Sequence, residues 1–451
     1  MQQRVTDLET RLRDLEDQLR RHAGNSSVPP SANPPQAPKP VVKRPTGKKP
    51  GGQPGHPPHL RVRLPAERVR HTVVHRPTAC ERCRQPLPTV PRPQDPEPTW
   101  HQILDIPEVS AFAIEHQGHA CTCPCCGHVT RAAIPAEVRQ TGIGPNLAAA
   151  VAYWTGCLHL SKRAAQEASE DLFGAPLALG TVTALEQEVS AGLQPVYAEA
   201  AAAARAAPVK NVDETSWKWA GHKCWLWAVV TAVALFFTIH RHRGDAGPRA
   251  LLGDDIAGII GSDRWVVYDQ FDAYRRQLCW AHLPRDFQAM VERGADSRRV
   301  GEALLLFAED VFHGWYRVRD GTLARSTFRR YIDEQRPWLR QRLEEGARLE
   351  QAKTAAVCRN VLAWEPALWT FVRREGVEPT NNAAERALRT AVLWRKRSFG
   401  CHGEAGCRFV ERMLTVVQTL RRQGRQVLGF LKQTVIAHRE GQATPRLVLE
   451  R

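Results

Sequence analysis

The feature that most constrains the fold is a run of strand-like segments in the middle of the chain. After Val209 the sequence reads VKNVDET, then CWLWAVV, then ALFFTIH. Each segment is rich in the β-branched and aromatic residues that favour strands. A short helical stretch, 246–252, and the segment GIIGSD follow. Three strands in succession, then a helix and another strand, predict an α/β unit built around one sheet.

Two aspartates are predicted to end strands of this sheet. Asp213 closes the first strand, and Asp263 closes the fourth. If those strands are neighbours, the two carboxylates meet at one edge, where they repel each other unless a divalent cation lies between them. Mg²⁺ accepts such pairs and keeps waters that a phosphate can displace. The order of elements predicts a ribonuclease-H-like sheet, although an Asp at a strand end is often only a turn residue.

A third carboxylate is expected from a helix that passes over the same edge. In the segment EPTNNAAERALR, Asn381 or Asn382 can cap a helix, and Glu385 then lies in its first turn. The alternative is a surface ion pair of Glu385 with Arg389, one helical turn further on. A basic run that would suit a DNA strand follows downstream, at Arg395, Lys396 and Arg397.

The charge of the chain favours a polyanionic partner. With 451 residues it is long enough for two or three folded units, and its 63 Lys and Arg against 47 Asp and Glu give a net charge of +16. Nucleic acid fits this charge, as would an anionic membrane surface. The N-terminus has no secretory signal, and the most apolar stretch, Cys224 to Ile239, is shorter than the roughly 18–20 residues of a membrane helix. We therefore expect a cytoplasmic, nucleoid-associated protein without a membrane partner.

Residues 1–24 have the pattern of a coiled coil. Apolar residues recur at alternating steps of three and four, at Val5, Leu8, Leu12, Leu15 and Leu19. We expect this helix to dimerise, or alternatively to dock as a single amphipathic helix on its own chain. Residues 25–70 form a Pro- and Gly-rich linker that buries too little apolar surface to fold alone. Its basic residues either remain solvated or grip phosphates; they include Lys39, Lys43, Arg44, Lys48 and Lys49.

Residues 71–136 carry two CxxC pairs, Cys80 with Cys83 and Cys123 with Cys126. Two thiolates three residues apart can reach one tetrahedral Zn²⁺, and twelve cysteines diluted over a long chain favour a reducing compartment over disulfides. Cys121 and Cys125 lie close enough to leave the choice within the second pair open. The zinc would hold a ribbon together, with direct DNA contact as an addition. Strands are expected between the pairs, around 103–106 and 112–114.

Residues 137–207 show a helical pattern. One face would carry Leu147, Val151, Trp154 and Leu158. Ser161 can cap a second helix that runs to Phe173, and Thr181 can cap a third. Three short helices with Gly-containing turns are typical of a helix-turn-helix, which predicts DNA binding, although many small helical bundles have the same pattern and bind nothing.

Several long motifs resemble the bacterial insertion-sequence transposases of family number sixty-six, which belong to the DDE group. They span most of the chain: NSSVPPS, GKKPGGQPGH, the two CxxC pairs, NVDETSW, SDRWVVY, RQLCWAHLPRDF, NNAAERALR and RKRSFG. The resemblance implies that Asp213, Asp263 and Glu385 are the catalytic carboxylates. It also implies transposon-end and target DNA as substrates and helper proteins encoded by the same element.

The same resemblance implies how the second half of the chain divides into domains. The ribonuclease-H-like core would comprise 208–290 and 375–436, interrupted by a helical insertion over 291–374 and followed by a tail, 437–451. Cys279 and His282 resemble a CxxH signature that follows the second aspartate in many DDE enzymes. His282 would lie near the scissile phosphate, or it is a buried structural histidine at a strand-to-helix junction.

The predicted function is transposition by in-line phosphoryl transfer with two Mg²⁺ or Mn²⁺ ions. One ion would activate a water and later a 3′-hydroxyl, and the other would stabilise the leaving oxygen. The alternatives are a catalytically silent, sequence-specific DNA-binding protein derived from a transposase, and a nuclease or resolvase on the same fold. The active form is expected to be a homo-oligomer assembled through the N-terminal helix.

Overall fold

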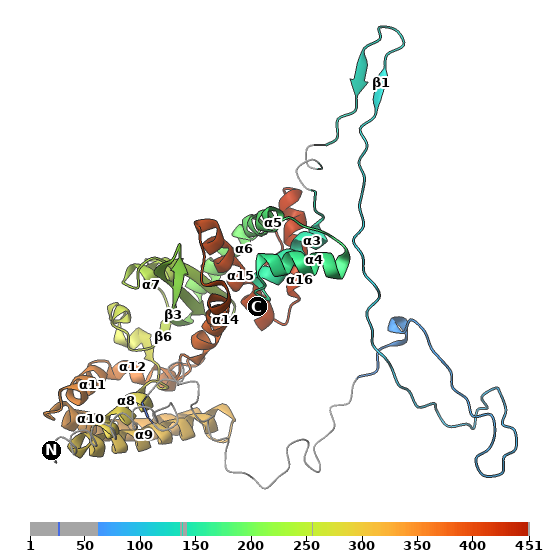
Figure 1. Ribbon diagram of the computed structural model, residues 1–451. Coiled ribbons are helices and arrows are strands. Elements are labelled where there is room, and N and C mark those ends of the chain that lie inside the picture. The colour runs from blue at the N-terminus through green and yellow to red at the C-terminus, as the bar shows by residue number, and fades with distance from the viewer. Residues whose placement is uncertain (1–25, 28–61, 136–137, 139–141, 255, 450–451) are drawn as a thin grey trace, which may run out of the picture. The chain divides into compact units, whose positions relative to one another are not determined.

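The computed structural model describes residues 26–27, 62–135, 138, 142–254 and 256–449 (Figure 1). The chain divides into two compact units, 39–109 and a larger one that comprises 1–38 and 110–451. The predicted zinc-binding domain, 71–136, is thus divided between the units. The predicted coiled coil, 1–24, and the basic linker residues Lys39, Lys43, Arg44, Lys48 and Lys49 lie outside the described residues.

Regular structure is sparse among the described residues of the segment 62–135. The smaller unit has a 3₁₀ turn, Ala66–Arg68, and the larger unit begins with a hairpin of β1 (Ala120–Thr122) and β2 (Val129–Arg131). The strands predicted around 103–106 and 112–114 are wrong, because both segments are extended without a strand partner. Their alternating apolar residues have no surface to pack on, and Ile103, Ile106 and Phe112 are more than four-fifths exposed.

Helices follow over 145–206: α3 (Pro145–Gly156), α4 (Lys162–Phe173), α5 (Leu179–Gly192) and α6 (Gln194–Ala206). The Ser161 cap is confirmed, since its hydroxyl accepts the N–H of Ala164 (3.1 Å). The expected cap at Thr181 is wrong, because α5 begins two residues earlier, after Ala178. Of the expected apolar face, Leu158 lies beyond the end of α3 and is exposed.

These helices do not stand alone. The helices α3 and α5 pack on α16 (Val427–Arg439), and α5 and α6 also contact α15 (Glu404–Arg422). Figure 1 shows α3, α4 and α5 beside α16. Leu447 of the predicted tail is fully buried in the same core. The region predicted as a separate helical module therefore shares its core with the C-terminal helices.

A five-stranded mixed sheet forms the centre of the larger unit. The strands are β3 (Val209–Trp219), β4 (His222–Val230), β5 (Leu235–His240), β6 (Ile259–Ser262) and β7 (Arg276–Leu278). Their spatial order is β5-β4-β3-β6-β7. The first three are antiparallel, whereas β6 and β7 run parallel to β3. The helix between β5 and β6 is α7 (Ala246–Leu252), at the predicted bounds.

The prediction that β3 ends at Asp213 is wrong. The strand continues to Trp219, because it pairs with β4 from Asn211 to its end. Its pairing with β6 does stop early, at Asn211. Asp213 therefore lies inside a strand but beyond the last residue that pairs with β6.

Different helices cover the two faces of the sheet. On one face Trp217 packs with Trp394 of α14 (Asn382–Ser398) and with residues of α15. On the other, Trp227 packs with Leu251 of α7. Because neighbouring residues of a strand point to opposite faces, Asp213 lies on the α14 face, as Trp217 does, and Glu214 lies on the α7 face.

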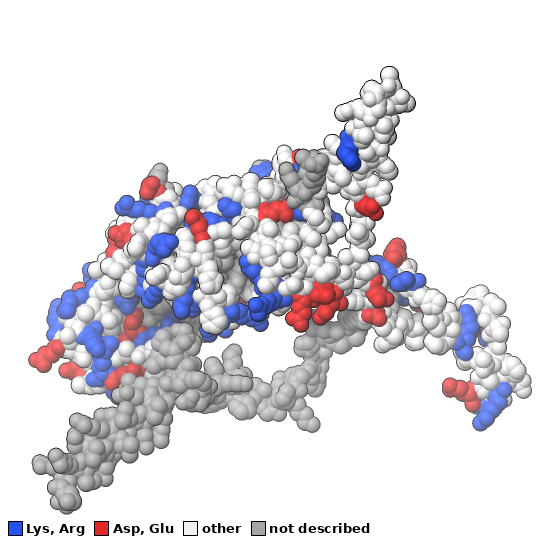
Figure 2. All heavy atoms as spheres, turned by 45° about the horizontal axis from the view of Figure 1, so that its top comes forward, with Lys and Arg blue, Asp and Glu red and all other residues white. Residues whose placement is uncertain are grey.

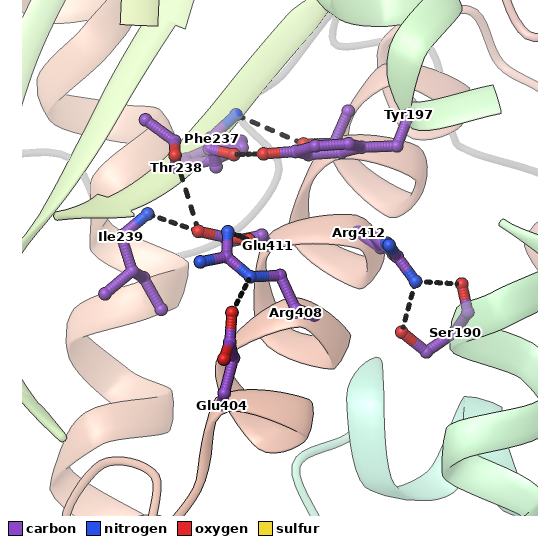
Figure 3. A network of polar contacts seen from close by, with 10 residues as sticks. Ser190, Tyr197, Phe237, Thr238, Ile239, Glu404, Arg408, Glu411 and Arg412 are labelled. Carbon is purple, nitrogen blue, oxygen red and sulfur yellow. Dashed lines mark hydrogen bonds and ion pairs between the residues drawn. The ribbon is translucent and has the colours of Figure 1, made fainter. Parts of the chain in front are cut away.

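The edge strand β5 of the sheet is buried and is capped by side chains of α15. Three alternate main-chain N–H groups donate to oxygens spaced four residues apart on the helix: Leu235 to Thr419 (3.0 Å), Phe237 to Thr415 (3.1 Å) and Ile239 to Glu411 (2.6 Å). Two strand residues advance about 6.6 Å, and four helix residues about 6 Å, so the two spacings match. Figure 3 shows Glu411 reaching from α15 to Ile239 and Thr238, with Arg408 beside it.

A second core belongs to the helices between β7 and α14. It is built by α8 (Leu283–Glu292), α9 (Ala295–Arg319), α10 (Arg325–Ala347), α11 (Ala352–Ala363), α12 (Glu365–Leu368) and α13 (Thr370–Arg373). The periodicity expected over 291–374 thus corresponds to helices with an apolar centre of their own. No helix within the described part of the chain is both long and apolar enough to cross a membrane.

Candidate active site

The register of the sheet brings Asp213 and Asp263 level with each other. Val209 pairs with Ile259 and Asn211 with Gly261, an offset that, continued by two residues, joins Asp213 to Asp263. Asp263 directly follows β6, and its carboxylate accepts the N–H of Trp265 (2.9 Å). The two carboxylates therefore come from neighbouring parallel strands, as the sequence predicted.

A buried arginine fixes the backbone at Asp263. Arg276 is fully buried, and it donates to the Asp263 carbonyl (2.8 Å) and to the Ser262 hydroxyl (3.1 Å). Its charge is balanced by Asp269 (2.9 Å). Because these contacts leave the Asp263 side chain free, Arg276 positions that carboxylate without neutralising it.

Asp213 is surrounded by negative charge. Burial raises its pKa well above the usual range, and Glu214, Asp263 and Glu385 raise the pKa further. Negative charges this close to Asp213 disfavour its ionisation unless a cation lies among them. The electrostatics at Asp213 are those of a site that a divalent ion would stabilise.

Glu385 lies in the first turn of α14, and the start of this helix is pinned to β3. Asn381 precedes the helix, as predicted, but its side chain makes no cap. Instead its amide donates to the carbonyl of Val212 (2.6 Å), the residue before Asp213. Asn381 is 1% exposed, so the anchor is shielded from water. This single contact holds the helix start that carries Glu385 to the strand that carries Asp213.

The alternative for Glu385, an ion pair with Arg389, does not occur among the described residues. Its carboxylate lies 3.7 Å from Nε2 of His282, which precedes α8. Oε1 of Glu385 and Nδ1 of His282 are both buried without a hydrogen-bond partner. Burial, and to a lesser extent Arg285, lowers the pKa of His282. Both side chains thus keep polar atoms unsatisfied next to the carboxylate cluster.

Glu214 is a buried neighbour of the site whose contacts the sequence did not reveal. It adjoins Asp213 but faces the other side of the sheet, where its side chain is 1% exposed. It forms an ion pair with Arg243 (2.8 Å) and accepts the Tyr268 hydroxyl (2.6 Å). Arg243 stacks in turn over the ring of Trp265 (3.9 Å). The only sequence signal for the different environments of Asp213 and Glu214 is that neighbouring residues of a strand point to opposite faces of the sheet.

The basic residues of α14 have different environments. Arg395 turns inward and donates to the carbonyl and hydroxyl of Ser216 on β3, whereas Lys396 and Arg397 are exposed. Arg395 is thus bonded to its own chain, and Arg397 also donates to the carbonyl of Leu158 (3.3 Å) while its side chain stays exposed. Figure 2 shows further Lys and Arg side chains spread over one face, with acidic residues among them.

Each CxxC pair closes the same turn. The carbonyl of Cys80 accepts the N–H of Arg84, and that of Cys123 accepts the N–H of Gly127, both at 2.9 Å. Arg84 (φ 61°) and Gly127 (φ 70°) share a left-handed conformation. Main-chain N–H groups lower the pKa of Cys80 and Cys123, chiefly those of Cys83 and Cys126 respectively. This repeated geometry singles out Cys123 with Cys126 over Cys121 and Cys125.

The chain segment that contains the three carboxylates matches a known protein family. The family model described as "Transposase IS66 family" matches residues 140–408, and a family of unknown function matches 1–62. An uncharacterised protein designated y4qI, from Sinorhizobium fredii, is 25% identical over 243 residues. That alignment covers 49% of this chain and 44% of the relative, so the chain spans less than half of the relative's length.

Proposed function

We propose that this chain, which belongs to the IS66 transposase family, cuts and joins transposon-end DNA at Asp213, Asp263 and Glu385. The matched segment, 140–408, contains all three residues. The observation that carries the proposal is geometric: Asp213 lies level with Asp263 on the neighbouring strand, and the helix start that carries Glu385 is bonded to the residue before Asp213. The strand order β5-β4-β3-β6-β7 supports a ribonuclease-H-like core around them.

The donor set fits hard divalent cations. Three carboxylates face one region, one of them with a buried oxygen that has no partner, and Mg²⁺ or Mn²⁺ prefers oxygen ligands of this kind. Asp213, Asp263 and Glu385 would hold the ions. When bound, two such ions would polarise the scissile phosphate and activate the attacking hydroxyl.

The protein's own contribution is positioning. Arg276 holds the Asp263 backbone and Asn381 holds the start of α14 against β3, so that the three carboxylates keep their relation as DNA enters. His282 would contact the scissile phosphate from beside Glu385, with its neutral form favoured by burial. Exposed Lys396 and Arg397 would contact phosphates of the same strand. The reaction needs no covalent protein intermediate.

The function is tested with a duplex that carries the terminal repeat of the element, incubated with the full chain. We expect a shifted complex with or without metal, and strand cleavage followed by joining only with Mg²⁺ or Mn²⁺. A Glu385→Gln variant should still shift the DNA. Shifted DNA that stays uncut in Mg²⁺ would instead favour a DNA-binding protein derived from a transposase. Cleavage of branched or hybrid substrates without joining would favour a nuclease or resolvase.

Structural zinc and assembly belong to the same proposal. Each CxxC pair, Cys80 with Cys83 and Cys123 with Cys126, closes the same turn, which supports binding of Zn²⁺ by these thiolates. Helper proteins of the element and self-assembly through residues 1–24 would complete the active complex. These partners follow from the family and from the leucine repeat.

Replacing Cys123 should remove this zinc, whereas replacing Cys125 should not. Main-chain N–H groups, chiefly that of Cys126, lower the pKa of Cys123, which favours metal binding by its sulfur, while Cys125 lies within the turn and is exposed. We expect the Cys123→Ser variant to lose one zinc per chain relative to wild type in elemental analysis. The Cys125→Ser variant is the matched control. Equal zinc loss from both variants would contradict the pairing.

A further inference from the structure

A second group of metal-binding atoms lies beside the carboxylate cluster and shares only Glu385 with it. Cys279 follows β7, His282 precedes α8, and Glu385 lies in the first turn of α14. Their sulfur, nitrogen and oxygen atoms all lie within 4.8 Å of one another. Among the described residues no other three or more His, Cys, Asp or Glu side chains come this close. We propose that these three side chains bind a transition-metal ion of the zinc class.

The local backbone aims the two CxxH side chains at one point. The N–H of His282 bonds back to the carbonyl of Cys279 (3.3 Å), which closes a turn and brings the thiol and imidazole together. The Cys279 sulfur accepts the main-chain N–H of Asn381 (3.1 Å). Asn381 is itself clamped to Val212, so the thiol is fixed relative to α14 and Glu385. The group is therefore assembled by three elements and held by buried contacts.

Unsatisfied atoms favour an ion at this place. Nδ1 of His282 and Oε1 of Glu385 are buried and lack a hydrogen-bond partner. A buried polar atom without a partner destabilises the fold, because it has lost its hydrogen bonds to water. A cation that accepts a lone pair from each side chain would offset that cost. The two side chains are adjacent: Oε1 of Glu385 lies 3.7 Å from Nε2, the other imidazole nitrogen of His282.

The ligand types select against Mg²⁺. Magnesium demands oxygen ligands in octahedral geometry, whereas a thiolate, an imidazole and a carboxylate suit tetrahedral Zn²⁺ with one position left for water or substrate. Cobalt(II) accepts the same set. Asp213 and Asp263 lie outside this group. An ion bound here would therefore draw Glu385 away from the two strand carboxylates.

This competition gives the site a regulatory consequence, which rests on the proposed function. Zinc bound to Cys279, His282 and Glu385 would occupy a carboxylate that the Mg²⁺-dependent reaction needs. Zinc should then inhibit DNA cleavage in Mg²⁺. The cleavage rate without zinc divided by the rate with zinc should be smaller for the Cys279→Ser variant than for wild type. The binding itself needs no catalysis and is tested separately.

Cobalt titration of the full chain without DNA tests the site. We expect wild type to bind one more Co²⁺ per chain than the Cys279→Ser variant, with thiolate-to-cobalt absorption in the difference spectrum. Both proteins contain the CxxC pairs, so cobalt bound at those pairs does not contribute to the difference. A Cys358→Ser variant is the matched control, because Cys358 is also a fully buried thiol but lies in the core of the helical insertion.

His282→Asn provides a second variant in case loss of the buried Cys279 thiol impairs folding, since His282 is less buried. It should lose the same ion. Equal cobalt binding by wild type, Cys279→Ser and His282→Asn would overturn the site. Cys279-dependent binding in a chain that never cuts DNA would uphold the site and overturn the proposed function. Mg²⁺-dependent cleavage with Cys279-independent cobalt binding would overturn the site alone.

Discussion

Replacing Asp213 with Asn is expected to reduce strand cleavage about 10³-fold or more, equivalent to ~4 kcal/mol of barrier, and to leave DNA-end binding intact. Asn keeps the size of the side chain but loses the charge that would hold a divalent ion. Asp213 lies level with Asp263, and the start of the helix that carries Glu385 is bonded to Val212, the residue before Asp213. Cleavage and gel-shift assays on the same terminal duplex measure the two effects.

The adjacent Glu214 supplies the control. It faces the other side of the sheet, where it pairs with Arg243 and Tyr268. A Glu214→Gln variant should keep metal-dependent cleavage and lose about 1–3 kcal/mol of unfolding free energy, because its ion pair is broken. Loss of cleavage in Glu214→Gln with retained cleavage in Asp213→Asn would exchange the roles assigned to the two residues.

The same substitution at Asp213 should change the pH dependence of stability. Burial and neighbouring carboxylates raise the folded-state pKa of Asp213 above its unfolded value. The metal-free wild type is then favoured while Asp213 is protonated, and it loses stability as pH rises through the raised pKa. The Asn variant lacks this loss, so it should be the more stable of the two at neutral pH in chelator. Urea unfolding at several pH values measures the difference.

Replacing Glu411 with Ala is expected to have the largest effect on stability, about 3–5 kcal/mol. Its side chain is fully buried, accepts the N–H of Ile239 and pairs with Arg408 (2.7 Å) (Figure 3). Removal leaves the N–H of Ile239 without its acceptor and takes the buried partner from Arg408, which keeps only its exposed contact with Glu404. Urea denaturation of the full chain gives the free energy of unfolding.

Two further variants separate the charge of Glu411 from its hydrogen bond. Burial raises the pKa of Glu411 despite Arg408, so the negative charge is costly at this place. Glu411→Gln keeps an acceptor for Ile239 and should cost far less than Glu411→Ala. Glu404→Ala is the surface control, since Glu404 also pairs with Arg408 but its side chain is 69% exposed, and it should cost about 0–1 kcal/mol. Equal losses in Glu411→Ala and Glu404→Ala would refute the edge-capping role.

Local signals predicted many of the elements. Strand composition located β3 to β6, the cap at Ser161 located α4, and the Asn pair located the start of α14. These signals work because each depends on residues that are near one another in the sequence. The helical insertion was also evident from its periodicity. The end of β3 was predicted wrongly at Asp213. The strand continues because it pairs with β4 in a hairpin, which the residue type at position 213 does not determine.

Long-range contacts account for what the sequence did not reveal. The partners of Glu214 and Asn381 come from segments dozens of residues away, and no spacing rule connects them. The packing of α3 and α5 on α16 has the same origin. From the sequence Arg395 was predicted to contact DNA, whereas in the structure it donates to the hydroxyl of Ser216. The carboxylate positions were accessible from the sequence, whereas the groups that hold them in place were not.

The central claim, that Asp213 binds the metal that supports cleavage, is tested most directly by an Asp213→Cys variant assayed in Mg²⁺ and in Mn²⁺. A thiolate is a poor ligand for Mg²⁺ and an acceptable one for Mn²⁺. We predict no cleavage of the terminal duplex by this variant in Mg²⁺ and restored cleavage in Mn²⁺, with wild type active in both. Cleavage by Asp213→Cys in Mg²⁺ at the wild-type rate would contradict the account.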